Sequence, residues 1–272
     1  MRKTGIVQLT AVAAAFLVVA AVHGQSEMLP RASDIQAAQG NIHITPIKHA
    51  SLQIEYANRV ISVDPISANN NAAAKAADLI LVTDIHGYHM DAKAVQAFRK
   101  PGGIVVAPTS VRDALGANVP DVSVLDNGQS GTFAGVALEA VPMYNMQRGP
   151  SAGQFLHPKG RGDGYILTLG GKRLYIAGDT ECTPEMKALK NIDVAFVPMN
   201  LPYTMTPTEA ADCVKAFAPK VVYPYHYSQA TNEQEFAAAM KGAQNIEVRA
   251  EDWYVGGAAP AGGRGDQGGR GR

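Results

Sequence analysis

Metal-binding side chains are concentrated in residues 84–91 of this 272-residue chain, directly after an apolar run. The segment contains Asp84, His86, Tyr88 and His89. Imidazole is the commonest metal ligand in proteins, and carboxylates often accompany it at zinc sites. On an irregular loop, imidazoles three residues apart can aim at one point, whereas in a regular strand they would face opposite sides of the sheet. The segment therefore predicts a metal site, with a histidine-rich surface loop as the alternative.

Three later positions show the same arrangement, in which an apolar strand, or the loop after it, delivers a ligand-type side chain. These residues are His157, Asp179 and His226, which follow residues 136–143, 175–177 and 221–223. Buried strands lie side by side, so their ends meet at one edge of a sheet. We therefore expect these side chains to converge with those of residues 84–91.

The strands that must position these side chains are predicted from alternating or β-branched apolar runs between Gly, Pro and Asn residues. They are residues 43–47, 51–56, 59–63, 79–82, 104–107, 122–125, 132–134, 136–143, 165–169, 173–177, 194–197, 221–223 and 246–248. Pro224 is expected to end the strand before it. Helices are predicted at residues 92–98, 110–115, 184–189, 206–217 and 232–241. Along the chain, strands come first and then alternate with helices. This order favours two mixed sheets packed face to face with helices outside.

The order of the motifs resembles the metallo-β-lactamase superfamily of metal-dependent hydrolases over residues 41–253, and is closest to the branch that contains sugar-lactone hydrolases. The matching motifs are Asp84-x-His86-x-Tyr88-His89, His157, Gly178-Asp179-Thr180 and His226. The resemblance implies an α/β (α+β) fold, an αββα four-layer sandwich of two mixed β-sheets. It also implies a site for one or two metal ions at one edge of the sheets.

The resemblance assigns a role to each matching residue. A first metal site would be formed by Asp84, His86, His157 and Asp179, and a second by His89, His226 and Asp179. The expected ions are one or two Zn²⁺, with Mn²⁺ or Fe²⁺ as alternatives. Behind these ligands, Asp64 is expected to support the ligand loop, and His49 to line the pocket.

Two positions depart from the superfamily, whose loop usually reads His-x-His-x-Asp-His. Asp84 stands at the first position and offers oxygen in place of nitrogen, which shifts preference towards harder ions. Tyr88 stands at the fifth position, and a phenol with a pKa of about 10 is a poor ligand. We therefore predict a weak second metal site.

The expected chemistry is attack of a metal-activated water on a carbonyl or phosphoryl centre of a small ester-type substrate: a lactone, ester, amide or phosphodiester. Asp179 and Tyr88 are the predicted catalytic residues. Tyr144, Tyr203 and Tyr227 are candidate substrate contacts. The alternative is a non-catalytic metal- or ligand-binding protein on the same fold, with a site degraded at Asp84 and Tyr88.

The sequences of the two termini predict a location outside the cytoplasm and the limits of the folded domain. Residues 1–24 have a basic start and an apolar run, typical of a signal peptide, with an uncleaved anchor as the alternative. We expect an arm at residues 25–40, a domain at 41–255 and a disordered Gly/Arg-rich tail at 256–272. The location would be periplasmic or secreted, with no stable membrane association after cleavage.

Charge and cysteine content narrow the partners further. Lys and Arg together number 24, as do Asp and Glu, which leaves no basic surface for nucleic acid. The resemblance implies a small-molecule substrate as the partner, and oligomerisation is left open. Cys182 and Cys213 permit a disulfide, but Cys213 lies in an apolar helical pattern and is interpreted as a buried small hydrophobe, while the state of Cys182 is left open.

Overall fold

Two seven-stranded sheets form the fold in the computed structural model, which describes residues 1, 33–67, 74–229, 231–251 and 253. Apart from Met1, the predicted signal peptide and the Gly/Arg-rich tail lie outside these residues. The first sheet contains β1 (Ser33–Ala37), β2 (Gly40–Lys48), β3 (Ser51–Tyr56), β4 (Arg59–Val63), β5 (Ala77–Leu81), β6 (Arg99–Ala107) and β7 (Val122–Val124). The second contains β8 (Ser130–Phe133), β9 (Val136–Met143), β10 (Gly162–Leu169), β11 (Lys172–Ile176), β12 (Val194–Met199), β13 (Val221–Tyr227) and β14 (Glu247–Val248).

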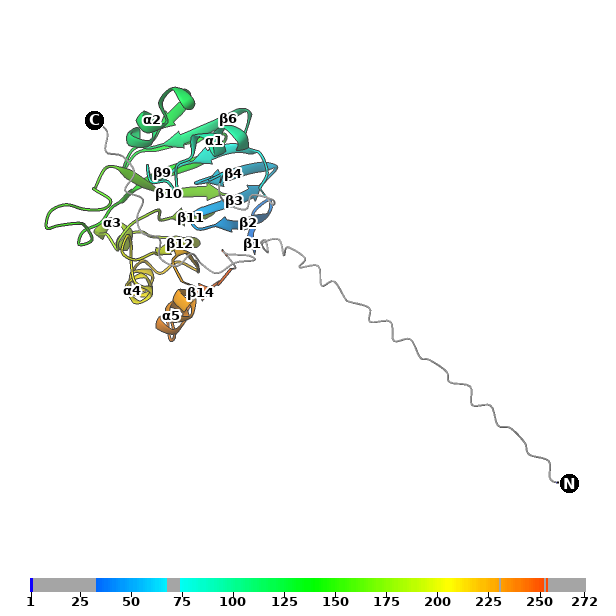
Figure 1. Ribbon diagram of the computed structural model, residues 1–272, viewed down its shortest axis with the longest axis vertical. Coiled ribbons are helices and arrows are strands. Elements are labelled where there is room, and N and C mark those ends of the chain that lie inside the picture. Colours follow the sequence, from blue (N-terminus) through cyan, green and yellow to red (C-terminus); the bar gives the residue numbers. More distant parts are fainter. Residues whose placement is uncertain (2–32, 68–73, 230, 252, 254–272) are drawn as a thin grey trace.

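Both sheets follow one plan, since their first four strands are antiparallel and the later strands are parallel. The helices are α1 (Ala92–Phe98), α2 (Thr109–Leu115), the short 3₁₀ helix η1 (Gly116–Asn118), α3 (Pro184–Lys187), α4 (Pro207–Phe217) and α5 (Thr231–Ala239). Figure 1 shows α1 and α2 beside β6, and α3, α4 and α5 at the opposite end of the molecule. The predicted four-layer sandwich is confirmed.

Apolar side chains from both sheets fill the space between them. Ile54 and Leu79 of the first sheet belong to one buried cluster with Leu167 and Phe196 of the second. A separate cluster, which includes Ile80 and Val105, lies on the outer face of the first sheet with side chains of α1 and α2. β5 is thus buried on both faces, with Leu79 in one cluster and Ile80 in the other, which explains its continuous apolar run.

Three features differ from the expectations. Residues 33–37, expected in a loose arm, form β1, because the residues of β1 pair antiparallel with residues 40–44 of β2. β13 continues through Pro224, because β14 pairs only with Val221 and Val222, so the missing N–H of Pro224 interrupts no ladder bond to β14.

The third difference is a disulfide between Cys182 and Cys213, whose Cα atoms lie 5.7 Å apart. It joins the turn after β11 to α4. Cys213 is buried, as expected of a small hydrophobe, but its sulfur is bonded to Cys182, which that interpretation did not include. The two cysteines are brought together by tertiary contacts that their sequence neighbourhoods do not reveal.

Candidate metal centre

The loop after β5 is held at both ends. A turn at His86 is closed by backbone N–H groups of His89 and Met90, which donate to the His86 carbonyl at 2.9 Å. Asp91 then caps α1 and accepts from the backbone N–H groups of Lys93 and Ala94. Because the cap satisfies free N–H groups of α1, it fixes where the loop ends and the helix begins.

Three predicted ligands form one group at the mouth of this loop. His86 Nδ1 lies 3.1 Å from His157 Nε2 and 3.4 Å from Asp84 Oδ2. His157 Nε2 lies 3.8 Å from Asp84 Oδ2. Asp84 and His157 are buried, and His86 is half-buried.

The other three predicted ligands form an adjacent, fully buried group. Asp179 Oδ2 lies 3.2 Å from His89 Nε2, and Asp179 Oδ1 lies 3.1 Å from His226 Nε2. Asp179 Oδ2 also lies 3.3 Å from His157 Nε2 in the first group. Asp179 therefore stands between the two groups, as a bridging carboxylate would.

The spacing of these atoms fits metal ions. Ligands about 2.1 Å from a tetrahedral zinc ion lie about 3.4 Å from one another, and the six distances run from 3.1 to 3.8 Å. Among the described residues, His89 Nε2, Asp179 Oδ1 and His226 Nε2 are buried without a hydrogen-bond partner. Buried polar atoms are rarely left unpaired, so these atoms are suited to an ion.

Hydrogen bonds behind two of the ligands turn their imidazoles towards the site. His89 Nδ1 donates to Asp64 Oδ2 at 2.7 Å, and His157 Nδ1 donates to Asn145 Oδ1 at 2.7 Å. Each bond fixes a proton on Nδ1, so Nε2, which faces Asp179, is the nitrogen available to an ion. Asp64 also accepts from the backbone N–H and the hydroxyl of Thr83, so it lies where the sequence placed it, behind the ligand loop.

Charge in the ion-free site is shared between carboxylates and imidazoles. Burial lowers the pKa of His89, but the charges of Asp179 and Asp64 outweigh burial and raise it well above its usual range. Burial raises the pKa of Asp179, but the charges of His89 and His226 hold it well below its usual range. An ion bound by this set would replace the proton on His89.

The loop that carries His157 is anchored by Glu181, two residues after Asp179. The Glu181 carboxylate accepts from the backbone N–H groups of Met146, Gln147 and Arg148 at 2.8 to 3.0 Å. Glu181 directly follows the Gly178-Asp179-Thr180 motif, but the sequence did not reveal which loop it holds.

Tyr88 and His49 lie together beside His226 but outside the two ligand groups. The rings of Tyr88 and His49 are 4.8 Å apart between centroids, and the Tyr88 ring lies 6.5 Å from that of His226. Tyr88 is 51 % exposed, and burial lowers the pKa of His49 to about 3. His49 is therefore neutral at physiological pH, and Tyr88 is available to solvent.

The three tyrosines considered for substrate contact lie in different settings. The Tyr144 hydroxyl donates to Glu185 at 2.9 Å, and Lys159 lies over its ring. Tyr203 is half-buried, and its carbonyl accepts from Asn145. Tyr227 is buried at the end of β13. Tyr144 therefore points its polar end at a surface ion pair, and contact of all three with substrate stays a prediction.

Several residues of the centre adopt left-handed backbone conformations. The φ angles are +55° at His49, +46° at Asp64 and +46° at His226. Such angles are uncommon for residues with a Cβ and mark positions that the surrounding structure enforces. Gly178, with φ +65°, is required before Asp179, because a Cβ there would lie 2.4 Å from the Met143 sulfur.

Arg161 was not anticipated as part of this centre. Its Nε and Nη2 atoms donate to the two carboxylate oxygens of Asp84 at 3.0 and 2.8 Å. It follows His157 by four residues in a loop rich in Gly, Pro and charge, where no periodicity distinguishes it.

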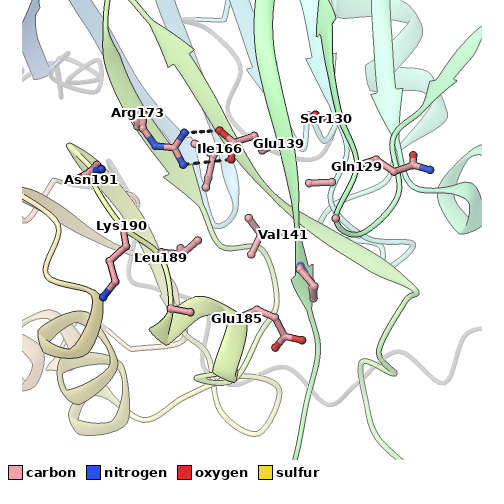
Figure 2. A pocket seen from close by; sticks show the side chains of 14 residues that line it. Gln129, Ser130, Glu139, Val141, Ile166, Arg173, Glu185, Leu189, Lys190 and Asn191 are labelled. Atoms are coloured by element: carbon pink, nitrogen blue, oxygen red, sulfur yellow. Dashed lines mark hydrogen bonds and ion pairs between the residues drawn. The ribbon is translucent and has the colours of Figure 1, made fainter.

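A cavity of about 660 Å³ lies elsewhere, beside β9, β10 and α3 (Figure 2). Val141 and Ile166 line it, and an ion pair between Arg173 and Glu139 borders it. None of its lining residues belongs to the two ligand groups, so the ligands, not the cavity, locate the candidate centre.

Sequence comparison identifies the family. A model of the β-lactamase superfamily domain matches residues 43–226, which include every ligand named above. The chain belongs to the metallo-β-lactamase superfamily. One relative, the UPF0173 metal-dependent hydrolase of Thermococcus kodakarensis, is 34 % identical over 190 residues, covering 66 % of this chain and 82 % of that protein. Another, from Pelotomaculum thermopropionicum, is 29 % identical over 222 residues, covering 76 % and 95 %.

Solved structures of the superfamily share the fold. A candidate metal-dependent hydrolase from Parabacteroides distasonis is 42 % identical, with a TM-score of 0.74 over 81 % of this chain and 98 % of that one. The metallo hydrolase Igni18 from Ignicoccus hospitalis is 23 % identical, with a TM-score of 0.63, and is similar in fold. Family and relatives together support a metallo-hydrolase, and the two ligand groups are the part of this chain suited to hold its metal.

Proposed function

We propose that this protein hydrolyses a small ester-type substrate (a lactone, ester, amide or phosphodiester) at a carbonyl or phosphoryl centre. The observation that carries the proposal is the pair of ligand groups that share Asp179. A divalent ion held there would supply Lewis acidity and acidify a water to a pKa of about 7. Zinc suits this set of imidazoles and carboxylates, and Mn²⁺ or Fe²⁺ are the alternatives favoured by the added oxygen of Asp84.

The residues of the chain have separate tasks in this scheme. Asp84, His86 and His157 would hold the first ion, and His89 and His226 would hold the second, with Asp179 as a ligand available to both groups. Asp179 is also placed to accept a proton from the attacking water. Tyr88 is exposed at the rim beside His226, where its hydroxyl is available to substrate. Because Tyr88 replaces the usual carboxylate, the second ion is the weaker of the two.

Metal analysis of purified protein tests the metal centre. We expect at least one equivalent of zinc in the wild type and a loss of most of it in His86→Ala and Asp179→Ala. His43→Ala is the matched control, because His43 is a half-exposed imidazole that pairs with Asp34 away from the ligands. A wild-type protein that binds no transition metal would refute the mechanism.

A substrate panel tests the reaction. Zinc-loaded protein should hydrolyse at least one member of a panel of lactones, esters, amides and phosphodiesters, and Asp179→Ala should not. The second candidate function, a non-catalytic metal-binding protein, is motivated by Tyr88 at a position where the superfamily usually has Asp. It predicts that the wild type is inactive on the whole panel and that Tyr88→Asp gains activity.

We also propose a periplasmic or secreted location. The Cys182–Cys213 disulfide supports it, because disulfides persist in oxidising compartments. Among the described residues, no helix is long and apolar enough to span a membrane. A fusion of residues 1–24 to a reporter enzyme that is active only outside the cytoplasm should be exported and cleaved. Activity confined to the cytoplasm would contradict the location.

A further inference from the structure

We propose that Arg161 is a positioning residue that acts on the metal centre through Asp84, so that the two residues together replace one neutral imidazole. The inference rests on the proposed metal-binding function. It concerns an interaction between two residues that the superfamily pattern does not predict, since that pattern usually has histidine at the position of Asp84.

Arg161 is itself fixed from several sides. Its backbone N–H donates to the carbonyl of Pro158 at 3.2 Å, and its own carbonyl accepts from the hydroxyl of Ser110 at the start of α2. Its side chain is 19 % exposed, and the Asp84 side chain that it contacts is fully buried. The guanidinium is therefore held against the carboxylate by the fold and is not a loose surface partner.

The contact leaves Asp84 able to bind an ion. Nε and Nη2 each donate to a different carboxylate oxygen, and each oxygen has two lone pairs. Oδ2, which faces His86 Nδ1 at 3.4 Å, thus keeps one lone pair for the centre. The two-pronged contact also fixes the plane of the carboxylate, which a single donor would not do. Arg161 therefore decides which oxygen of Asp84 meets the ion and at what angle.

Charge gives the second part of the argument. Replacing a neutral histidine by Asp84 adds one negative charge to a buried site, and an unpaired buried charge is strongly destabilising. The guanidinium of Arg161 cancels it, so the pair carries the same net charge as the imidazole. Arg161 Nη2 also lies 3.4 Å from His86 Nε2. If Nδ1 of His86 bound the ion, Nε2 would carry the proton, and Asp84 would remain the acceptor for Arg161.

A double-mutant cycle with Zn²⁺ affinity as its readout tests the pair. Affinity is measured by competition with a chromophoric chelator, and folding by circular dichroism and thermal unfolding. We expect Arg161→Gln and Asp84→His each to weaken Zn²⁺ binding at the first ion by at least about tenfold, as loss of a partner behind a ligand usually does. In the double variant Asp84→His/Arg161→Gln, the imidazole stands alone and affinity should return to within a few-fold of wild type.

Arg173→Gln is the matched control. It removes another two-pronged arginine–carboxylate pair, with Glu139, which borders the cavity of Figure 2 and not the metal centre. Its Zn²⁺ affinity should equal that of the wild type. If Arg161→Gln does not fold, the comparison of Asp84→His with the double variant still decides, because only the proposed pairing predicts that the second change restores binding.

The outcomes separate the two proposals. Wild-type affinity in Arg161→Gln or in Asp84→His, or losses that simply add in the double variant, would overturn the role of Arg161 and leave the metal centre standing. Absence of Zn²⁺ binding in the wild type would overturn both. Recovery in the double variant together with an unchanged control would establish the pair.

Discussion

Asp163 provides the sharpest test of the electrostatics beneath the metal centre. It lies at the start of β10, directly below the ligand loop, where its backbone N–H donates to the carbonyl of Thr83 at 2.9 Å. Its carboxylate is fully buried; Oδ1 accepts from Asn127, and Oδ2 has no hydrogen-bond partner among the described residues. Burial, assisted by the charge of Asp126, raises the pKa of Asp163 to about 7 from an ordinary value of 3.8.

The sign of the effect on stability follows from proton binding. Between pH 3.8 and about 7, the folded protein retains a proton that the unfolded chain has released. The stability that this proton confers is complete below pH 3.8 and is lost as the pH rises through 7. A rise in the pKa of Asp163 from 3.8 to about 7 corresponds to about 4 kcal/mol, since a tenfold change in an equilibrium constant is worth about 1.4 kcal/mol.

Asp163→Asn should remove this penalty, because an amide does not ionise. Relative to the wild type, we expect little change in the free energy of unfolding at pH 4 and a gain approaching about 4 kcal/mol at pH 8. The assay is urea denaturation from pH 4 to 8.5 with a chelator present. His49 and His86, whose pKa values burial lowers to about 3 and about 4, add the opposite slope below pH 6.5, but they cancel in the difference between the two proteins.

Asp121→Asn, at an exposed carboxylate, is the control and should shift stability little at any pH. A difference between Asp163→Asn and the wild type that is constant from pH 4 to 8.5 would refute the reasoning. So would a variant that is less stable than the wild type at pH 8.

Three further predictions concern single side chains. Tyr88→Asp should tighten the second Zn²⁺ equivalent at least about tenfold by adding a carboxylate ligand, while Tyr88→Phe should leave it unchanged; both are measured by chelator competition. Cys182→Ser should lower the free energy of unfolding by about 3 to 4 kcal/mol, because the disulfide closes a loop with a sequence separation of 31. Reductant should produce the same loss in the wild type and none in the variant. Glu181→Gln should speed amide hydrogen exchange at Met146, Gln147 and Arg148, since a neutral acceptor holds N–H groups less strongly than a carboxylate; unchanged exchange would contradict its anchoring role.

Local patterns in the sequence predicted most of the fold. The run before Asp84 gave a buried strand, and the helix after Asp91 has the predicted bounds, Ala92–Phe98, because Asp91 caps it and β6 begins directly after it. The strands predicted at residues 165–169 and 173–177 also formed, as β10 and β11, which pair antiparallel. These elements depend on periodicity, caps and turns, which are properties of neighbouring residues.

The features that the sequence did not predict depend on contacts between residues far apart in the chain. Residues 33–37 form a strand because they pair with the edge of β2, and Cys182 meets Cys213 through the packing of α4 against the turn after β11. Arg161 lies 77 positions from Asp84 in the sequence, and the residues that flank either one do not predict their contact. For the site, residue types and spacing indicated which atoms converge, whereas the partners that orient those atoms depend on tertiary contacts.

The backbone at His49, Asp64 and His226 has a consequence for how this chain can change over time. Left-handed conformations at residues with a Cβ carry about 1 to 2 kcal/mol of strain each, and glycine would relieve it. At these three positions of the centre, the residue present therefore disfavours the backbone conformation that the fold imposes. In a lineage released from selection for its reaction, glycine should accumulate at these three positions while the apolar core is retained. The result would be a less strained protein of the same fold without activity.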